Sequence, residues 1–352
     1  MKTFDYVRPA TIREAVAAAS EPGAAYLAAG TNLLDLMKGG ITRPSRLVDI
    51  SHLPDVDLIE DLSDGGVRIG ALVSNSDLAH DRAFARRFPM VAEALLSGAS
   101  AQLRNAATVG GNVLQRTRCA YFYDVASACN KRDPGSGCDA RDGENRLHAV
   151  MGWSASCIAT HPSDFCVPLV ALDAVVEIEG AAGRREIPLE TFHRLPGDAP
   201  ERENILQQGE MIVAVRLPPE AAHFGAHARY IKVRERTSYA FAVVSAAAAL
   251  RIDGNTITQA RLALGGVAMK PWRVREAELI LVGGRADASL FHRAAETAVA
   301  QAKPSGDNAF KIELARRIIV RALALAAAGT PERLPALPAS PLASVSGDVI
   351  HV

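Results

Sequence analysis

Residues 107–164 read ATVGGNVLQRTRCAYFYDVASACNKRDPGSGCDARDGENRLHAVMGWSASCIATHPSD. The stretch opens on a Gly-Gly-Asn turn and closes on a His-Pro-Ser-Asp turn. Between the turns lie four of the five cysteines of the chain, namely Cys119, Cys129, Cys138 and Cys157. The fifth, Cys166, follows just after the closing turn. So uneven a distribution of thiols indicates a local chemical role.

Four thiolates can bind zinc or an iron–sulfur cluster. Nine, eight and eighteen residues lie between successive members of the set, so neither the C-x-x-C pairs of zinc ribbons nor the run of bacterial ferredoxins is present. The spacing therefore predicts a metal site without naming the metal. Free thiols in a disordered insertion are the weaker interpretation, because these cysteines lie among Arg, Lys, Asp and Gly rather than in an apolar run. His148 and His161 are further candidate ligands, although His161 fits a hydrogen-bonding loop residue better.

Cys166 is different, because it leads the apolar run Val-Pro-Leu-Val-Ala-Leu. That setting predicts a buried structural thiol rather than a fifth ligand.

Turn-forming residues such as Pro134 and Gly135 make the segment between the cysteines loop-like. A loop of this length needs something to order it, and metal ligation would do so.

The bulk composition excludes several classes of protein. The 352 residues contain 39 Lys plus Arg and 39 Asp plus Glu, so charge gives no case for binding nucleic acid or a membrane. No apolar run is long enough to span a bilayer. The N-terminus lacks a secretory signal pattern. We therefore expect either a cytoplasmic protein or a periplasmic one that is co-exported with a signal-bearing partner.

The order of the expected elements predicts an α+β protein with more than one domain. Strand–helix–strand alternation in the first sixty residues predicts a parallel pair, whereas strands followed by helices after Pro218 predict a separate α+β unit. We expect a first domain over 1–220, with subdomains of about 1–56 and 57–220 and an insertion at about 116–160. A C-terminal domain of three antiparallel strands and a helical bundle follows over 226–328, and then an extended tail over 329–352.

Two glycine turns are candidates for binding phosphate. Residues 26–34 (YLAAGTNLL) predict a strand, a turn at Gly30 and the start of a helix, and Thr108–Asn112 (TVGGN) form a second turn. Backbone N–H groups at such turns can hold a phosphate. Either turn alone is a weak signal. Two in one domain suggest a dinucleotide whose pyrophosphate is held from both sides.

These residues also resemble a known family. Leu27–Leu34 with Met37-Lys38, Arg104–Asn112, and Ser163-Asp164 are similar to the flavin-binding motifs of the FAD-binding subunits of the xanthine dehydrogenase, or molybdenum hydroxylase, family. The resemblance covers about residues 1–325. It implies a two-part, PCMH-like FAD-binding domain followed by an α+β domain. In most members the Gly-Gly-Asn turn leads almost directly to the Ser-Asp turn, so the cysteine segment is an insertion into the flavin-binding frame.

The inserted segment resembles that of the periplasmic aldehyde oxidoreductase flavoprotein subunits of proteobacteria, which implies a [4Fe–4S] cluster on Cys119, Cys129, Cys138 and Cys157. The same resemblance implies contacts with FAD. Asp164 would bond the adenosine part, Val215 would pack near the adenine, and Lys232 would reach the isoalloxazine edge. From the residues alone, Val215 fits plain core as well as a ligand contact. The phosphates and ribose would be held by Tyr26, Leu27, Ala28, Ala29, Gly30, Thr31, Asn32, Leu33, Leu34, Thr108, Gly110, Gly111 and Asn112.

The implied function is an FAD- and [4Fe–4S]-containing electron-transfer subunit of a molybdenum-dependent aldehyde oxidoreductase, with no catalytic acid or base of its own. Its implied partners are a large subunit with the molybdenum cofactor and a small subunit with two [2Fe–2S] clusters. A flavoprotein subunit like that of 4-hydroxybenzoyl-CoA reductase, a stand-alone flavin oxidase and a zinc-stabilised binding module are the alternatives. Whether the extra cluster carries electrons or only orders the insertion stays open.

Overall fold

The computed structural model describes residues 1–332, and the predicted tail over 329–352 therefore lies almost wholly outside the described residues. The chain begins with a parallel sheet of order β1-β3-β2, made of β1 (Asp5–Val7), β2 (Ala24–Leu27) and β3 (Arg46–Asp49). Helix α1 (Ile12–Ala19) starts at a capping box, in which Thr11 and Glu14 exchange hydrogen bonds. The parallel pair is as predicted, but β1 was missed because three residues carry little periodicity.

A five-stranded antiparallel sheet of order β4-β5-β8-β6-β7 forms the middle of the chain. Its central strand β8 is almost wholly buried, as its apolar sequence MIVAVRL predicts. The strands are β4 (Ile59–Asp61), β5 (Val67–Gly70), β6 (Val175–Gly180), β7 (Gly183–Pro188) and β8 (Met211–Leu217). The accompanying helices are α3 (Asn75–His80), α4 (Arg82–Arg87), α5 (Pro89–Ser97), α6 (Ala101–Ala106), α7 (Val109–Val113), α9 (Cys166–Ala171), α10 (Leu189–Phe192) and the 3-10 helix η2 (Pro219–His227).

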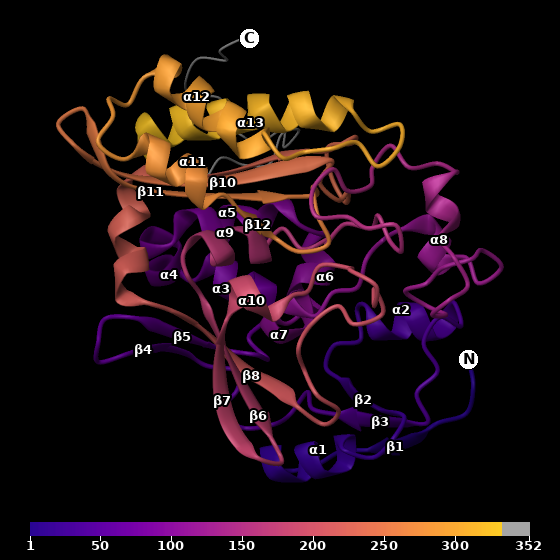
Figure 1. Cartoon of the computed structure of the whole chain (residues 1–352). Helices are drawn as coiled ribbons and strands as arrows, with labels where there is room; N and C mark the ends of the chain where they lie inside the picture. Colours follow the sequence, from indigo (N-terminus) through magenta and orange to yellow (C-terminus); the bar gives the residue numbers. More distant parts are fainter. Residues whose placement is uncertain (333–352) are drawn as a thin grey trace.

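The C-terminal part contains the three long antiparallel strands that were predicted, with a two-residue edge strand that was not. They are β9 (Ala228–Val233), β10 (Val244–Asp253) and β11 (Thr256–Gly265), with β12 (Trp272–Arg273) at the edge. Helices α11 (Arg275–Leu281), α12 (Ala288–Val299) and α13 (Phe310–Ala327) cover one face of this sheet (Figure 1). Gly329 (φ +104°) follows the last helix, as its sequence position predicts.

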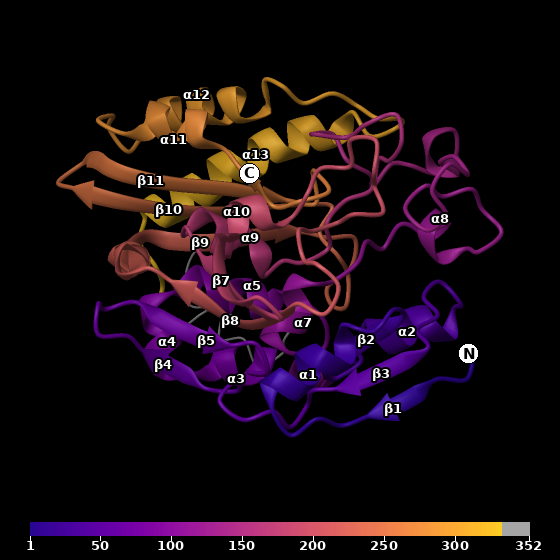
Figure 2. The ribbon, with the colours of Figure 1, turned by 60° about the horizontal axis from the view of Figure 1, so that its bottom comes forward.

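Strand β10 is buried on both faces because small alanines let helices approach on either side. Ala247 and Ala249 belong to the core shared with the middle sheet, while Ala246, Ala248 and Leu250 face the C-terminal helices. Figure 2 shows α5 and α9 on the side of this sheet opposite to α11–α13. The two cores therefore share one sheet, which fixes the C-terminal domain against the first domain.

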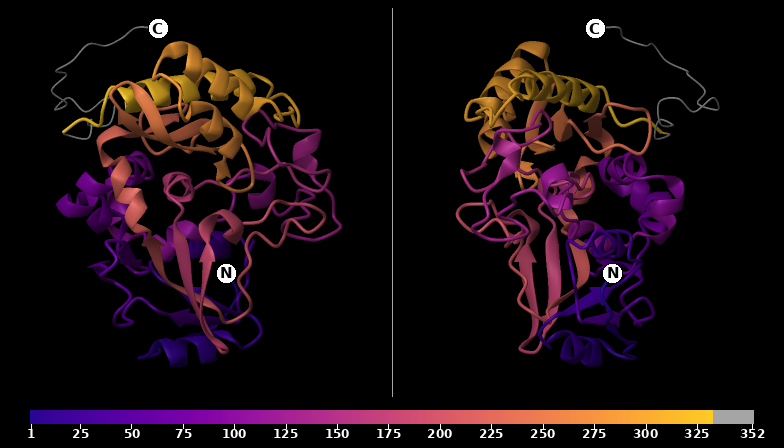
Figure 3. Two further views of the ribbon diagram at one scale, coloured as in Figure 1. Left: turned by 60° about the vertical axis from the view of Figure 1, so that its left-hand side comes forward. Right: turned by 90° about the vertical axis from the view of Figure 1, so that its right-hand side faces the viewer.

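The cysteine insertion stands out from one side of the molecule (Figure 3). It lies next to helix α2 (Leu33–Lys38) and contains only the short helices α8 (Ala120–Tyr123) and η1 (Asp139–Arg141) (Figure 1). Phe122 is fully buried against Leu36 and Cys129. The loop-like character predicted from its composition is thus what the structure shows. Among residues 1–332, no helix combines the length and the hydropathy required to cross a bilayer.

Candidate functional site: a flavin frame and a cysteine cavity

The first glycine turn joins β2 to α2 and leaves its residues accessible. Each residue from Tyr26 to Leu34 is partly or fully exposed, in contrast to the neighbouring strand β3. Gly30 has a φ of +72°, and a Cβ there would lie 2.6 Å from Leu34 Cδ1, so both the backbone and the packing require glycine. Asn32 Oδ1 accepts a hydrogen bond from the backbone N–H of Arg116 at 3.0 Å. This contact ties the turn to the start of the insertion.

The second turn is the start of the short helix α7. Thr108 is its N-cap and accepts a hydrogen bond from the N–H of Gly111 at 3.2 Å. The N–H of Gly110 donates to Ala71 O at 2.8 Å, and a Cβ on Gly110 would lie 3.0 Å from Ala71 Cβ. Gly110 is therefore required for close packing, and its N–H is already paired, whereas Gly111 is exposed.

The two ends of the insertion meet. Ser163 Oγ donates a hydrogen bond to Asn112 Oδ1 at 2.7 Å, although 51 residues separate them. Both side chains are buried. The expectation that the opening and closing turns are halves of one site agrees with this contact.

Asp164 and Lys232 form a buried ion pair, with Lys232 Nζ 2.7 Å from Asp164 Oδ2 and side chains 3% and 7% exposed for the lysine and the aspartate. Tyr230 Oη donates to the other carboxylate oxygen at 2.5 Å. Burial, followed by the Asp164 charge, holds the pKa of Tyr230 well above its ordinary value. The structure brings the two predicted FAD-binding residues Asp164 and Lys232 into direct contact, and their separate roles toward FAD stay predictions.

Val215 lies in the core. It is fully buried on β8, where it pairs with Ile69 and Val176 in the flanking strands. The structure thus places Val215 in the core, which was one of the two interpretations of the sequence, and the contact with adenine stays a prediction. An apolar residue in a central strand gives the same sequence signal in either case.

A cavity lies beside the Asp164–Lys232 pair. It is lined by residues 160–164 together with Arg118, Phe241, Ala242, Ser245, Gly265 and Gly266. The Arg118 guanidinium lies 5.3 Å from the ring centroid of Phe241, whose side chain is 48% exposed. Buried polar groups and one accessible aromatic ring suit a ligand that combines flat rings with a polar edge, as flavin does.

The four predicted ligands line a second cavity together. Cys119, Cys129, Cys138 and Cys157 share it with Lys131, whereas Cys166 lies elsewhere, fully buried in the core of the middle sheet. The segments around Cys129 and Cys138 are joined by an isolated antiparallel bridge. The separation of Cys166 from the other four agrees with the prediction from its apolar setting.

The spacing of the four sulfurs is wider than a single zinc ion requires. At a Zn–S distance of about 2.3 Å, a tetrahedral site puts its sulfurs about 3.8 Å apart. In residues 1–332, the one set of three potential ligand atoms lying within 4.8 Å of one another is found elsewhere, at His161, Cys166 and His193. An iron–sulfur cluster inserts its own iron and sulfide atoms between the thiolates and suits the wider spacing.

Burial raises the pKa of the Cys119 thiol to about 12 and also raises the pKa of Cys138 and Cys157. Buried thiols of this kind remain protonated at neutral pH unless a metal displaces the proton. The residues present therefore fit a metal cluster chemically, since ligation would supply the charge compensation that water does not.

Lys131 is the basic residue of the insertion that lines the cysteine cavity itself. Its side chain is 1% exposed, and Nζ lies 3.1 Å from Glu203, which also pairs with Arg116. Nζ donates to Pro200 O at 2.7 Å as well. A buried lysine inside a loop-like insertion was the available signal, but composition did not distinguish it from the solvated basic residues around it.

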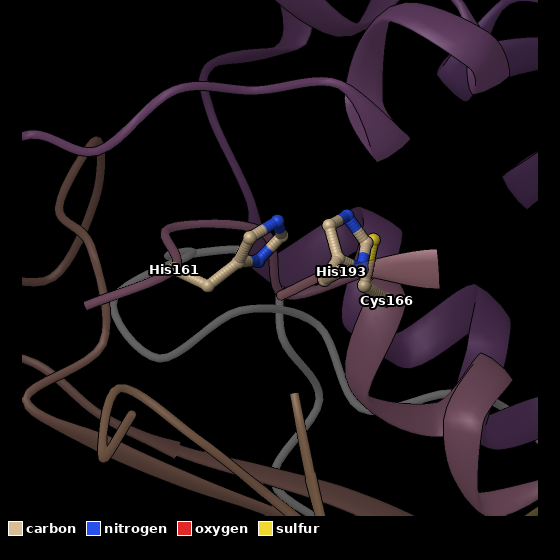
Figure 4. Close-up of side chains that lie close together, drawn as sticks. All are labelled: His161, Cys166 and His193. Carbon is tan, nitrogen blue, oxygen red and sulfur yellow. The ribbon is translucent and has the colours of Figure 1, made fainter. Parts of the chain in front are cut away.

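His161, Cys166 and His193 lie close together but do not make a metal site (Figure 4). The N–H of Ser163 donates to His161 Nδ1 at 3.3 Å, and burial holds the pKa of His161 well below its ordinary value. The proton of the neutral ring is therefore on Nε2, which cannot ligate. His193 Nε2 lies 2.9 Å from Val113 O and must carry a proton to donate a hydrogen bond to it. Only His193 Nδ1 and the Cys166 sulfur then have lone pairs that could bind a metal, which is one ligand fewer than the group of three side chains suggests.

Comparisons with known proteins agree with this geometry. Residues 2–220 match the family described as the FAD binding domain in molybdopterin dehydrogenase, and residues 229–326 match the CO dehydrogenase flavoprotein C-terminal domain. The fold and the site thus define an FAD-binding oxidoreductase subunit. The chain belongs to the xanthine dehydrogenase family, as an FAD-binding medium subunit of the molybdenum hydroxylases. The predictions of family, fold class and FAD binding are confirmed.

The aldehyde oxidoreductase FAD-binding subunit PaoB of Escherichia coli is 50% identical over 330 residues, which cover 93% of this chain and 99% of that protein. The carbon monoxide dehydrogenase medium chain of Hydrogenophaga pseudoflava is 28% identical, over 91% and 96% of the two chains. Among solved structures, carbon monoxide dehydrogenase from that organism gives a TM-score of 0.73 at 27% identity, covering 93% of this chain and 98% of the other. Quinoline 2-oxidoreductase from Pseudomonas putida gives 0.71 at 26% identity, with 93% and 99% covered.

Proposed function

We propose that this chain is the FAD- and [4Fe–4S]-containing electron-transfer subunit of a molybdenum-dependent aldehyde oxidoreductase. The observation that carries the cluster is the shared cavity of Cys119, Cys129, Cys138 and Cys157. The aldehyde class is supported by the 50% identical relative, which is an aldehyde oxidoreductase subunit. The proposed partners are a large subunit with the molybdenum cofactor and a small subunit with two [2Fe–2S] clusters.

The residues of this chain bind and orient; none is proposed as a catalytic acid or base. The exposed turn at Gly30 would offer backbone N–H groups to the phosphates of FAD, and the exposed Gly111 would let the chain approach them closely, since its own N–H is bonded to Thr108. The cavity beside Asp164 would hold the flavin rings, with Phe241 at its edge. When bound, FAD supplies the ability to accept and release electrons singly or in pairs.

The cysteine cavity would hold four iron atoms in a water-poor setting. Lys131 lines it and brings a positive charge, which favours an anionic cluster. Glu203 and Arg116 keep that lysine in place. The cavity also joins parts of the chain that are far apart in sequence, so a bound cluster would order the insertion.

The test is the purified complex, with FAD and iron counted per chain, and with Ser substituted singly for each of the five cysteines. We expect flavin bands with a broad iron–sulfur absorption in the wild type. Iron should be lost in C119S, C129S, C138S and C157S, and C166S should retain both cofactors. A zinc-containing, iron-free wild type would exclude the cluster. Loss of iron in C166S alone would exclude the ligand assignment.

A further inference from the structure

His148 is the one imidazole in contact with a cysteine of the cavity among the described residues. His148 Nε2 lies 3.2 Å from Cys119 Sγ, and the histidine is 8% exposed. Its other ring nitrogen, Nδ1, is buried and has no hydrogen-bond partner. The contact with sulfur is therefore the one side-chain hydrogen bond that the ring makes among the described residues, although the backbone of Asn145 also acts on the ring.

The C-terminal domain holds the backbone of His148 in place. His148 O accepts hydrogen bonds from Lys311 Nζ at 2.8 Å and from Asn308 Nδ2 at 3.1 Å, and both of these side chains are fully buried. Lys311 Nζ also donates to Leu147 O at 2.9 Å. The start of α13 thus fixes the segment that carries the ring.

The neighbouring residue links this segment to another cysteine of the set. The N–H of Ala149 donates to Ile158 O at 2.8 Å, one residue after Cys157. Asn308 Nδ2 binds Ala149 O at 3.1 Å as well. His148 is therefore fixed relative to two of the four cysteines and does not lie on a free loop.

The chemistry of the contact depends on what the sulfur carries. A thiolate bound to iron has lone pairs and no proton, so it can only accept a hydrogen bond. The imidazole must then carry its proton on Nε2, which lies 3.2 Å from the sulfur. Hydrogen bonds to the sulfurs stabilise the reduced, more negative state of an iron–sulfur cluster.

We propose that His148 donates an Nε2–H···S hydrogen bond to Cys119 as a ligand of the cluster, that this bond raises the reduction potential of the cluster, and that Lys311 and Asn308 act as positioning residues for it. The inference rests on the proposed [4Fe–4S] site. It assigns the C-terminal domain a role in positioning a group beside the cysteine cavity.

The experiment is an EPR-monitored measurement of the cluster's midpoint potential in the intact complex, with iron and FAD counted in each sample. H148L removes the donor. H148Q keeps an N–H donor of different reach, and H223L replaces an exposed histidine on η2 as the matched control. K311M tests the positioning role.

We expect H148L to retain iron and to lower the ratio of reduced to oxidised cluster at a fixed potential about tenfold, which is a shift of about −59 mV for a one-electron couple. H148Q should lie between H148L and the wild type, and H223L should match the wild type. K311M should shift the potential in the same direction as H148L. The H148L/K311M double variant should shift no further than H148L alone, because both changes act through one bond.

An unchanged potential in an H148L protein that retains its iron would overturn the inference and leave the proposed function standing. Loss of iron from both H148L and H148Q would overturn it too, since His148 would then be needed to hold the cluster. Absence of iron from the wild type is a separate result, and it would mean that the proposed function itself is wrong.

Discussion

Ser163 donates a hydrogen bond to Asn112 across 51 residues of intervening chain, at 2.7 Å and out of contact with solvent. Ser163 Oγ also accepts the N–H of Cys166 at 3.2 Å, so one hydroxyl closes the insertion and starts α9. The flavin-binding frame is therefore continuous in space where it is interrupted in sequence.

S163A should lower both the free energy of unfolding and the amount of FAD bound per chain. The change leaves the N–H of Cys166 without its partner, which costs about 1–3 kcal/mol, and removes one of the two hydrogen bonds to Asn112 Oδ1, the other coming from Gln115. Urea unfolding and FAD content per chain measure the two effects. S289A, at an exposed position on α12, should change the free energy of unfolding by less than about 0.5 kcal/mol. Equal effects of the two substitutions would contradict the role given to Ser163.

The Asp164–Lys232 pair should behave as one unit. K232M leaves a buried carboxylate with Tyr230 as its remaining side-chain partner, and breaking a buried pair in this way costs about 3–5 kcal/mol. The D164N/K232M double variant should lose less than the sum of the single losses in a double-mutant cycle. R216M breaks the more exposed pair with Glu186 and should cost at most about 1 kcal/mol. Additive losses at Asp164 and Lys232 would contradict the coupling.

The ion pairs of Glu203 predict how the stability of the fold depends on pH. Burial alone would raise the pKa of its carboxyl, but Lys131 and Arg116 outweigh burial and hold the pKa below the ordinary 4.5. The unfolded chain then binds a proton more readily than the folded one, so the stabilisation is complete above pH 4.5 and is lost as the pH falls through the folded pKa.

E203Q should therefore be less stable than the wild type at pH 7, and the difference should shrink as the pH falls below about 4.5. Chemical denaturation at a series of pH values measures it. E201Q, two residues earlier in the same loop, serves as the control. A gap between wild type and E203Q that stays constant with pH would exclude an ionic origin.

Comparing G30A with G183A should separate two reasons for glycine at position 30, namely its left-handed backbone and the lack of space for a Cβ atom. A non-glycine residue with a left-handed backbone costs about 1–2 kcal/mol, and the added Cβ would also displace Leu34. We expect the content of FAD to fall. G183A has the same backbone problem at φ +97° but nothing within 4 Å of the added Cβ, so it should lose stability while keeping FAD. Full FAD in G30A would show that the turn tolerates displacement of Leu34.

Local signals predicted much of the fold. The Thr11 capping box, the strand and helix around Gly30, and the β8 sequence MIVAVRL all form as their residue patterns indicate. These elements depend on neighbours within a few positions, which a single sequence displays. Strand β1 and edge strand β12 are too short to carry a period, and they exist because longer strands pair with them.

The site was harder to predict because its decisive contacts are distant in sequence. The four cysteines could be grouped from their shared polar setting, but the buried pairing of Asp164 with Lys232 required the fold. For Val215 the sequence left two interpretations open, because a buried strand residue and a ligand contact look alike in sequence. Lys311 gave no signal at all, since a lysine on an amphipathic helix is normally solvated.

The hydrogen bonds from Lys311 on α13 to the insertion have a consequence for folding during synthesis. Lys311 is 164 residues downstream of Leu147, so the carbonyls it binds leave the ribosome well before it does. A nascent chain can present all four cysteines while the contacts that fix their loop are still unmade. Final closure of the cysteine cavity is thus a late event in biogenesis, after synthesis has passed the start of the last helix.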